Sequence, residues 1–144
     1  MSHCERSTDF SRMMILACCL GSADVSWAAT SYIDAHLDDK GRLVLKASDG
    51  HIETPEIDKA RGEDMETQTG FDRPQISPNR KVVGWLSLYP NCCTSYDIPR
   101  ELVLYSNATV LLRLQGNGQS LFRWAFSTDS ERVAFCQGPL HFSN

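Results

Sequence analysis

The sequence predicts an all-β fold, an antiparallel meander of short strands joined by tight turns. Runs of strand length, rich in β-branched and aromatic residues, recur along the chain, and the stretches between them hold Gly, Asn, Asp and Ser. At 144 residues and 42% hydrophobic residues, the chain is long enough to bury one ordinary core. A formal net charge of -4 argues against nucleic-acid binding through a basic face.

Residues 1–28 fit a secretory signal peptide. Arg6 and Arg12 precede the apolar run 13–20, and the small-residue pattern at 26–28 predicts cleavage after Ala28. Acidic residues also lie in this segment, so a short amphipathic or buried N-terminal helix is one alternative. A second is a lipoprotein signal, because residues 15–18 loosely fit a lipid-modification box that ends at Cys18. The signal predicts a secreted or periplasmic protein with no transmembrane segment in the mature chain.

Cleavage would change the cysteine count from even to odd. The segment 1–28 contains Cys4 and two further cysteines, and the mature chain would keep Cys92, Cys93 and Cys136. In an oxidising compartment, an odd set predicts one pair plus a free thiol, or a pair with another chain.

Three regions follow the signal. Residues 29–53 form an N-terminal hairpin and meander, with strands at 32–37, 42–46 and 51–53 and turns at 38–41 and 48–50. Residues 54–70 are acidic, lack a sustained hydrophobic period and predict a solvated loop.

Residues 71–144 form the third region, a propeller-like β domain that holds most of the core. Ten of the thirteen aromatic residues lie between Phe71 and Phe142. Strands are expected at 81–88, 101–105, 109–114, 120–126 and 132–135, with a hairpin turn at 106–108. Several of these runs are apolar at consecutive positions, which predicts strands that are covered on both faces.

Two segments of this domain align without a gap, fifty residues apart. Residues 76–85 and 126–135 share an apolar residue, Ser, an Asn or Asp two positions later, and then a strand that ends on an aromatic residue. The spacing is that of propeller blades and predicts one to two such units, too few to close, hence an incomplete ring. A chance match between two β-turn-β segments is the alternative.

The stretch Ile76-Ser77-Pro78-Asn79-Arg80-Lys81-Val82-Val83-Gly84-Trp85 resembles the SPDG signature of TolB-type, WD-repeat-like propeller blades in exported bacterial proteins. The loop Tyr89-Pro90-Asn91-Cys92-Cys93-Thr94-Ser95-Tyr96 resembles that of a group of uncharacterised secreted bacterial proteins. The likeness covers residues 71–137. Asn79-Arg80 departs from the usual Asp-Gly, and residues 138–142 stand where such proteins would continue with another strand pair. The resemblance implies a fold and a compartment, and no activity.

The adjacent pair Cys92-Cys93 is the most informative chemical feature. Consecutive Cα atoms lie about 3.8 Å apart, which is shorter than the separation of about 4.4 Å that a disulfide ordinarily needs. A bridge between them would be strained and readily reduced. A bridge from either residue to Cys136, free thiols and metal ligation are the alternatives.

Function follows from these features as a prediction. We expect a non-enzymatic binding or scaffold module of the cell envelope that binds through the loop residues Tyr89, Asn91, Cys92, Cys93 and Tyr96. Its partner would be a protein or a second copy, paired through exposed β edges, and not nucleic acid. No catalytic residue, metal site or cofactor is predicted. The alternative is a redox-active thiol protein that uses Cys92 and Cys93, with Cys136 as a further disulfide candidate.

Overall fold

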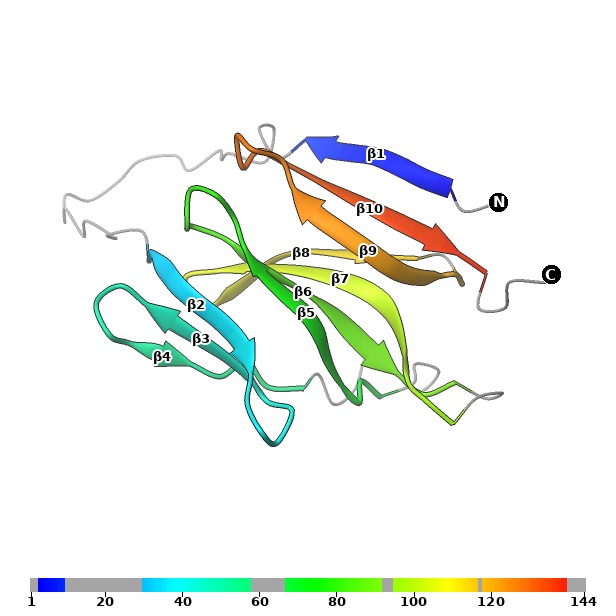
Figure 1. Cartoon of the computed structure of the whole chain (residues 1–144), viewed down its shortest axis with the longest axis horizontal. Helices are drawn as coiled ribbons and strands as arrows, with labels where there is room; N and C mark the ends of the chain where they lie inside the picture. The colour runs from blue at the N-terminus through cyan, green and yellow to red at the C-terminus, as the bar shows by residue number, and fades with distance from the viewer. Residues whose placement is uncertain (1–2, 10–29, 58–66, 92–94, 117, 140–144) are drawn as a thin grey trace, which may run out of the picture.

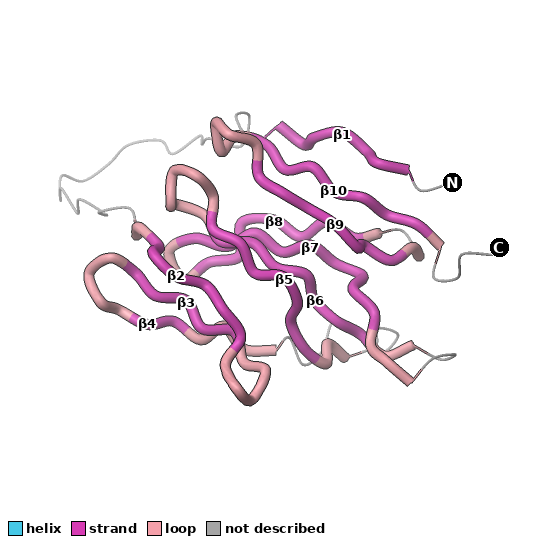
Figure 2. Tube along the Cα trace, viewed as in Figure 1, coloured by secondary structure: helices cyan, strands magenta, loops and turns pink. Residues whose placement is uncertain are grey.

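The computed structural model describes residues 3–9, 30–57, 67–91, 95–116 and 118–139, and all regular structure in them is β (Figures 1 and 2). Every strand pairing is antiparallel. The predicted all-β antiparallel meander is therefore confirmed. The strands are β1 (His3–Asp9), β2 (Tyr32–Leu37), β3 (Leu43–Ala47), β4 (Ile52–Glu53), β5 (Gly70–Ile76), β6 (Val83–Tyr89), β7 (Ile98–Ser106), β8 (Thr109–Gln115), β9 (Ser120–Phe126) and β10 (Arg132–Gly138).

The described strands form three separate sheets. The first has the order β2-β3-β4, the second β5-β6-β7-β8 and the third β1-β10-β9. Figure 1 shows the second sheet between the other two, and the described strands form no closed barrel. This arrangement agrees with an incomplete, blade-like meander. The third sheet is unusual because its outer strand comes from the other end of the chain.

The strand β1 lies inside the segment predicted to be a signal peptide. It pairs with β10 from His3 opposite Gln137 to Asp9 opposite Arg132. Residues 10–29, which include the predicted cleavage site, lie outside the described residues. The signal peptide stays a prediction, and a chain processed after Ala28 would lack β1.

The strand β5 falls where no strand was expected, at the start of the propeller-like region. Pro74 lies in its middle and cannot donate a ladder hydrogen bond. The register between β5 and β6 shifts between Asp72 and Gln75, so the bulge accommodates the proline. Arg73 takes a positive φ of 49° at this bulge. An interior proline therefore concealed a strand that the bulge makes possible.

The two inner strands of the central sheet, β6 and β7, are buried on both faces, as their continuous apolar runs predict. Side chains alternate along a strand, so neighbours face opposite sides. In β6 and β7, one set of alternate residues enters the cluster against the first sheet: Val83, Trp85, Val103 and Tyr105. The other set enters the cluster against the third sheet: Leu86, Leu102 and Leu104. Each apolar run thus serves two cores.

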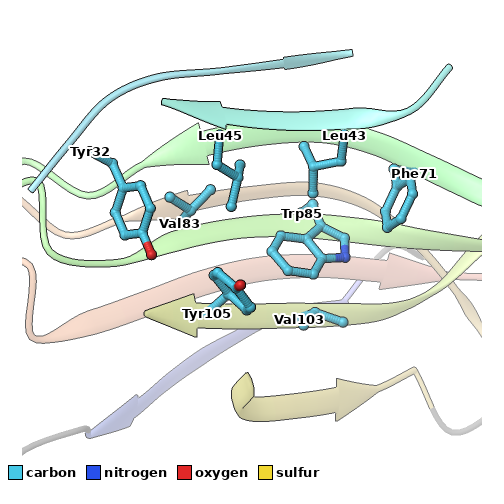
Figure 3. Close-up of a cluster of buried hydrophobic side chains, with 8 residues drawn as sticks. All are labelled: Tyr32, Leu43, Leu45, Phe71, Val83, Trp85, Val103 and Tyr105. Atoms are coloured by element: carbon cyan, nitrogen blue, oxygen red, sulfur yellow. The ribbon is translucent and has the colours of Figure 1, made fainter. Parts of the chain in front are cut away.

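Aromatic rings dominate the cluster between the first and central sheets (Figure 3). The Trp85 ring meets Phe71 edge-on at a centroid distance of 6.1 Å and Tyr105 at 5.5 Å. Tyr32, Leu43 and Leu45 close the cluster from the first sheet.

The cluster between the central and third sheets depends on a close approach at Gly84. A Cβ added there would lie 2.5 Å from Trp124 Cη2 and 2.9 Å from Leu104 Cδ2. Trp124 packs edge-on against Phe126 in the same cluster. The absence of a side chain at Gly84 makes room for the Trp124 ring.

Two turns, at 77–81 and 127–131, have the same hydrogen bonds. In each, the amide of the third residue past Ser77 or Ser127 donates to the serine carbonyl, and that residue, Arg80 or Ser130, takes a φ of 62° or 63°. The serine Oγ contacts Asn79 in one turn and Asp129 in the other. The turns also meet, because Asn79 N donates to Ser130 Oγ at 2.9 Å.

Candidate functional site

The predicted binding loop is only partly a surface feature. Tyr89 is buried, and its hydroxyl donates to Glu101 Oε2 at 3.2 Å. Tyr96 is 62% exposed, and Asn91 is half-buried. Cys92 and Cys93 lie outside the described residues. Of the two loop tyrosines, Tyr96 is the one that presents its ring to solvent.

A buried ion pair supports the base of this loop. Glu101 on β7 is 2% exposed, and its Oε2 accepts from Arg113 Nη1 on β8 at 2.9 Å. The buried charge is thus paired with a cation as well as accepting the Tyr89 bond, which is the condition for a carboxylate to be tolerated in a core. Arg100 Nη2 also donates to Pro90 O at 3.4 Å, which ties the end of the loop to β7.

A second polar cluster lies at the edge of the first interface. Glu53 Oε2 accepts from Tyr105 Oη at 2.7 Å, and the Tyr32 hydroxyl contacts the same carboxylate at 3.4 and 3.5 Å. Asn107 N donates to Tyr32 Oη at 3.2 Å.

Both tyrosines in this cluster resist ionisation. Burial, and then the neighbouring Glu53 charge, raises the pKa of Tyr32 to about 12. Burial, followed by the hydrogen bond to Glu53, raises the pKa of Tyr105 strongly. Each hydroxyl therefore stays protonated at neutral pH and can act as a hydrogen-bond donor.

The strand β8 is one of the two edge strands of the central sheet, and β5 is the other. Its Val110 and Leu111 are 38% and 40% exposed, next to each other along the strand. An edge strand presents backbone N–H and C=O groups in a row, and apolar side chains beside them favour pairing with another strand. The hairpin turn that leads into β8 is Asn107-Ala108, where both residues take a positive φ. This turn was predicted at 106–108.

Cys136 lies on β10 with its Cα opposite that of Cys4 on β1. Cys136 is disulfide-bonded. The register thus brings a cysteine of the predicted signal segment next to one of the three disulfide candidates.

Of the polar residues in the two clusters, the sequence patterns singled out only Tyr89. A hairpin centred on 107–108 already places Glu101 and Arg113 within two positions of each other, so this pair was within reach of sequence reasoning. The sequence predicts Glu53 as the last residue of the short strand 51–53, next to the acidic loop, and nothing local indicates that it meets Tyr32 and Tyr105.

Comparison with known proteins assigns the chain to no family. No protein-family model, curated protein or solved structure matches the chain. Within the described residues, no helix is long and apolar enough to cross a membrane, and no three His, Cys, Asp or Glu side chains gather as a metal site. Functional inference therefore depends on the surfaces and clusters described above.

Proposed function

We propose that the protein is a non-enzymatic binding or scaffold module that associates with another protein chain through its β8 edge. The observation that carries the proposal is the adjacent exposed pair Val110 and Leu111 on the outer strand of the central sheet. Strand addition to such an edge uses main-chain hydrogen bonds for affinity and alternate side chains for specificity.

The simplest partner is a second copy of the chain. Antiparallel pairing of two β8 strands would join two central sheets into one continuous sheet. The buried Glu101–Arg113 pair holds β8 against β7 from the inside, so the edge would be a rigid template.

Sedimentation velocity over a concentration series tests this association. We expect the wild-type chain to form dimers, and Val110→Lys/Leu111→Lys to sediment as a monomer, because lysines on an edge strand oppose pairing. Ile52→Lys is the matched control, since Ile52 is also an exposed apolar strand residue but lies on β4. A dimer that survives the double substitution, or a wild-type monomer throughout, would contradict the proposal.

The compartment of the protein is a second part of the proposal. The signal pattern of residues 1–28 and the likeness to secreted TolB-type blades support export to the cell envelope. Processing after Ala28 would remove β1, open the edge of β10 and separate Cys4 from Cys136.

The intact mass of the protein recovered from the envelope fraction distinguishes the two states. A mass that matches a chain starting at Ala29 supports export with removal of β1. A full-length chain that gains two hydrogens in mass on reduction, located by peptide mapping to Cys4 and Cys136, would instead support a retained β1 and contradict the predicted cleavage.

A further inference from the structure

A cavity of about 370 Å³ lies where β5 of the central sheet meets β9 and β10 of the third sheet. Its lining includes Arg73, Gln75, Arg123, Ala125 and Ala134. This volume falls within the range of small-molecule pockets, which begins at about 300 Å³. The cavity belongs neither to the β8 edge nor to the predicted loop.

The side of the cavity between β5 and β9 is fixed by cross-sheet hydrogen bonds. Gln75 Nε2 donates to Trp124 O at 3.0 Å, and Trp124 Nε1 donates to Arg73 O at 3.2 Å. Arg73 also donates through Nη1 to Phe122 O. These bonds join two strands that share no ladder, so the pocket is formed before any ligand arrives.

Small side chains leave the space. The register of β9 and β10 sets Ala125 opposite Ala134 and Arg123 opposite Cys136, so these four residues lie on one face of the sheet. Both alanines are exposed. Their methyl groups provide an apolar floor beside the longer side chain of Arg123.

The two arginines of the cavity have different roles. Arg73 is engaged by Asp72, with Nε 3.3 Å from Oδ2, as well as by the Phe122 carbonyl. Arg123 is exposed and forms no ion pair or side-chain hydrogen bond with the described part of the chain. A guanidinium in this situation offers a forked pair of donors that matches a carboxylate.

We propose that this cavity binds a small organic carboxylate, with its charged group on Arg123 and its apolar body over Ala125 and Ala134. The residue types select this class: a single uncommitted cation at the rim favours a monoanion, and the alanine floor favours a flat apolar body. Arg73 and Gln75 would shape the opposite wall.

Isothermal titration of the full-length chain with benzoate tests the proposal, with benzamide as the neutral analogue of the same shape. We expect benzoate to bind with a Kd on the order of 1 mM. Benzamide should bind about ten-fold more weakly or worse, because it lacks the charge-assisted bond. Inorganic phosphate serves as an anion without an apolar body and should bind more weakly than benzoate.

Two variants locate the site. Arg123→Gln should weaken benzoate binding about ten-fold. Arg42→Gln, which removes an exposed arginine next to β3 of the first sheet, is the control and should leave binding unchanged. Ala134→Leu fills the cavity without changing its charge and should abolish benzoate binding. Both site substitutions are at exposed positions, so unfolding profiles should match the wild type.

Three results would overturn the proposal. The first is no benzoate binding at about 10 mM. The second is binding that persists in Arg123→Gln and in Ala134→Leu. The third is phosphate or benzamide binding as tight as benzoate, which would exclude a carboxylate with an apolar body as the ligand class.

Discussion

The two faces of the central sheet are packed by different means. Toward the first sheet, Trp85, Phe71 and Tyr105 fill the interface with rings, and the tyrosine hydroxyls end on Glu53 at its rim. Toward the third sheet, Gly84 lets one ring, Trp124, approach the strand directly. The first interface depends on large side chains and a polar cluster, and the second on a missing side chain. We therefore expect them to fail under different substitutions.

The largest effect should come from Gly84→Ala, which breaks the second interface alone. The added methyl would overlap Trp124 Cη2 and Leu104 Cδ2, and overpacking of a core typically costs about 1–3 kcal/mol in the free energy of unfolding. Urea unfolding followed by fluorescence measures the loss.

Gly70→Ala is the matched control for this substitution, because its Cβ would meet only Leu88 Cδ1 at an ordinary 3.6 Å. Gly84→Ala combined with Trp124→Phe should recover part of the loss, since the smaller ring vacates the space. Equal destabilisation by both glycine substitutions, with no recovery, would refute the steric account of this interface.

The first interface should respond to pH through Glu53. The folded-state pKa of Tyr32 and of Tyr105 lies above the ordinary value of 10, so their contribution to stability is complete below about pH 10. It is lost as pH rises toward about 12, where the folded protein must ionise buried hydroxyls. In Glu53→Gln the neighbouring charge is gone, so the fall in stability should end at a lower pH.

Ultraviolet titration of tyrosinate measures this shift directly, and Glu53→Gln should also lower the free energy of unfolding at neutral pH by about 1 kcal/mol. Glu56→Gln removes an exposed carboxylate of the same segment and should reproduce the wild-type titration. A titration curve that Glu53→Gln leaves in place would show that burial alone raises the tyrosine pKa values.

Sequence reasoning performed best where a turn and its strands are local. The hairpins around 38–41 and 107–108 follow from turn residues and flanking alternation, and the strand β9 was predicted with its observed bounds. It failed where distant segments decide the outcome. Pro74 argues against a strand, so the sequence did not predict β5. The pattern of residues 1–28 predicts a signal peptide, so it did not predict that β1 pairs with β10. Arg123 becomes a candidate binding residue only because β5 lies beside β9 in the fold.

The smallest effect concerns the turn Asn107-Ala108, which joins β7 to β8. Ala108 takes a φ of 56°, and Asn107 one of 49°, the pattern of a turn that favours Asn-Gly. An alanine in the left-handed region is strained, whereas glycine adopts it freely. Ala108→Gly should therefore stabilise the protein by about 0.5 kcal/mol, the strain relieved less the greater entropy of glycine in the unfolded chain.

Ala134→Gly is the control, because the same alanine-to-glycine change should lower the free energy of unfolding at this position. Ala134 lies in β10 and takes no positive φ, so glycine there should cost about 0.5–1 kcal/mol.

The turn Asn107-Ala108 also borders the first interface, because Asn107 N donates to Tyr32 Oη. Gly84→Ala disturbs only the second interface, so the stabilisation by Ala108→Gly should persist in the double variant. Additive free energies of unfolding in the double variant would show that the two faces of the central sheet are energetically independent.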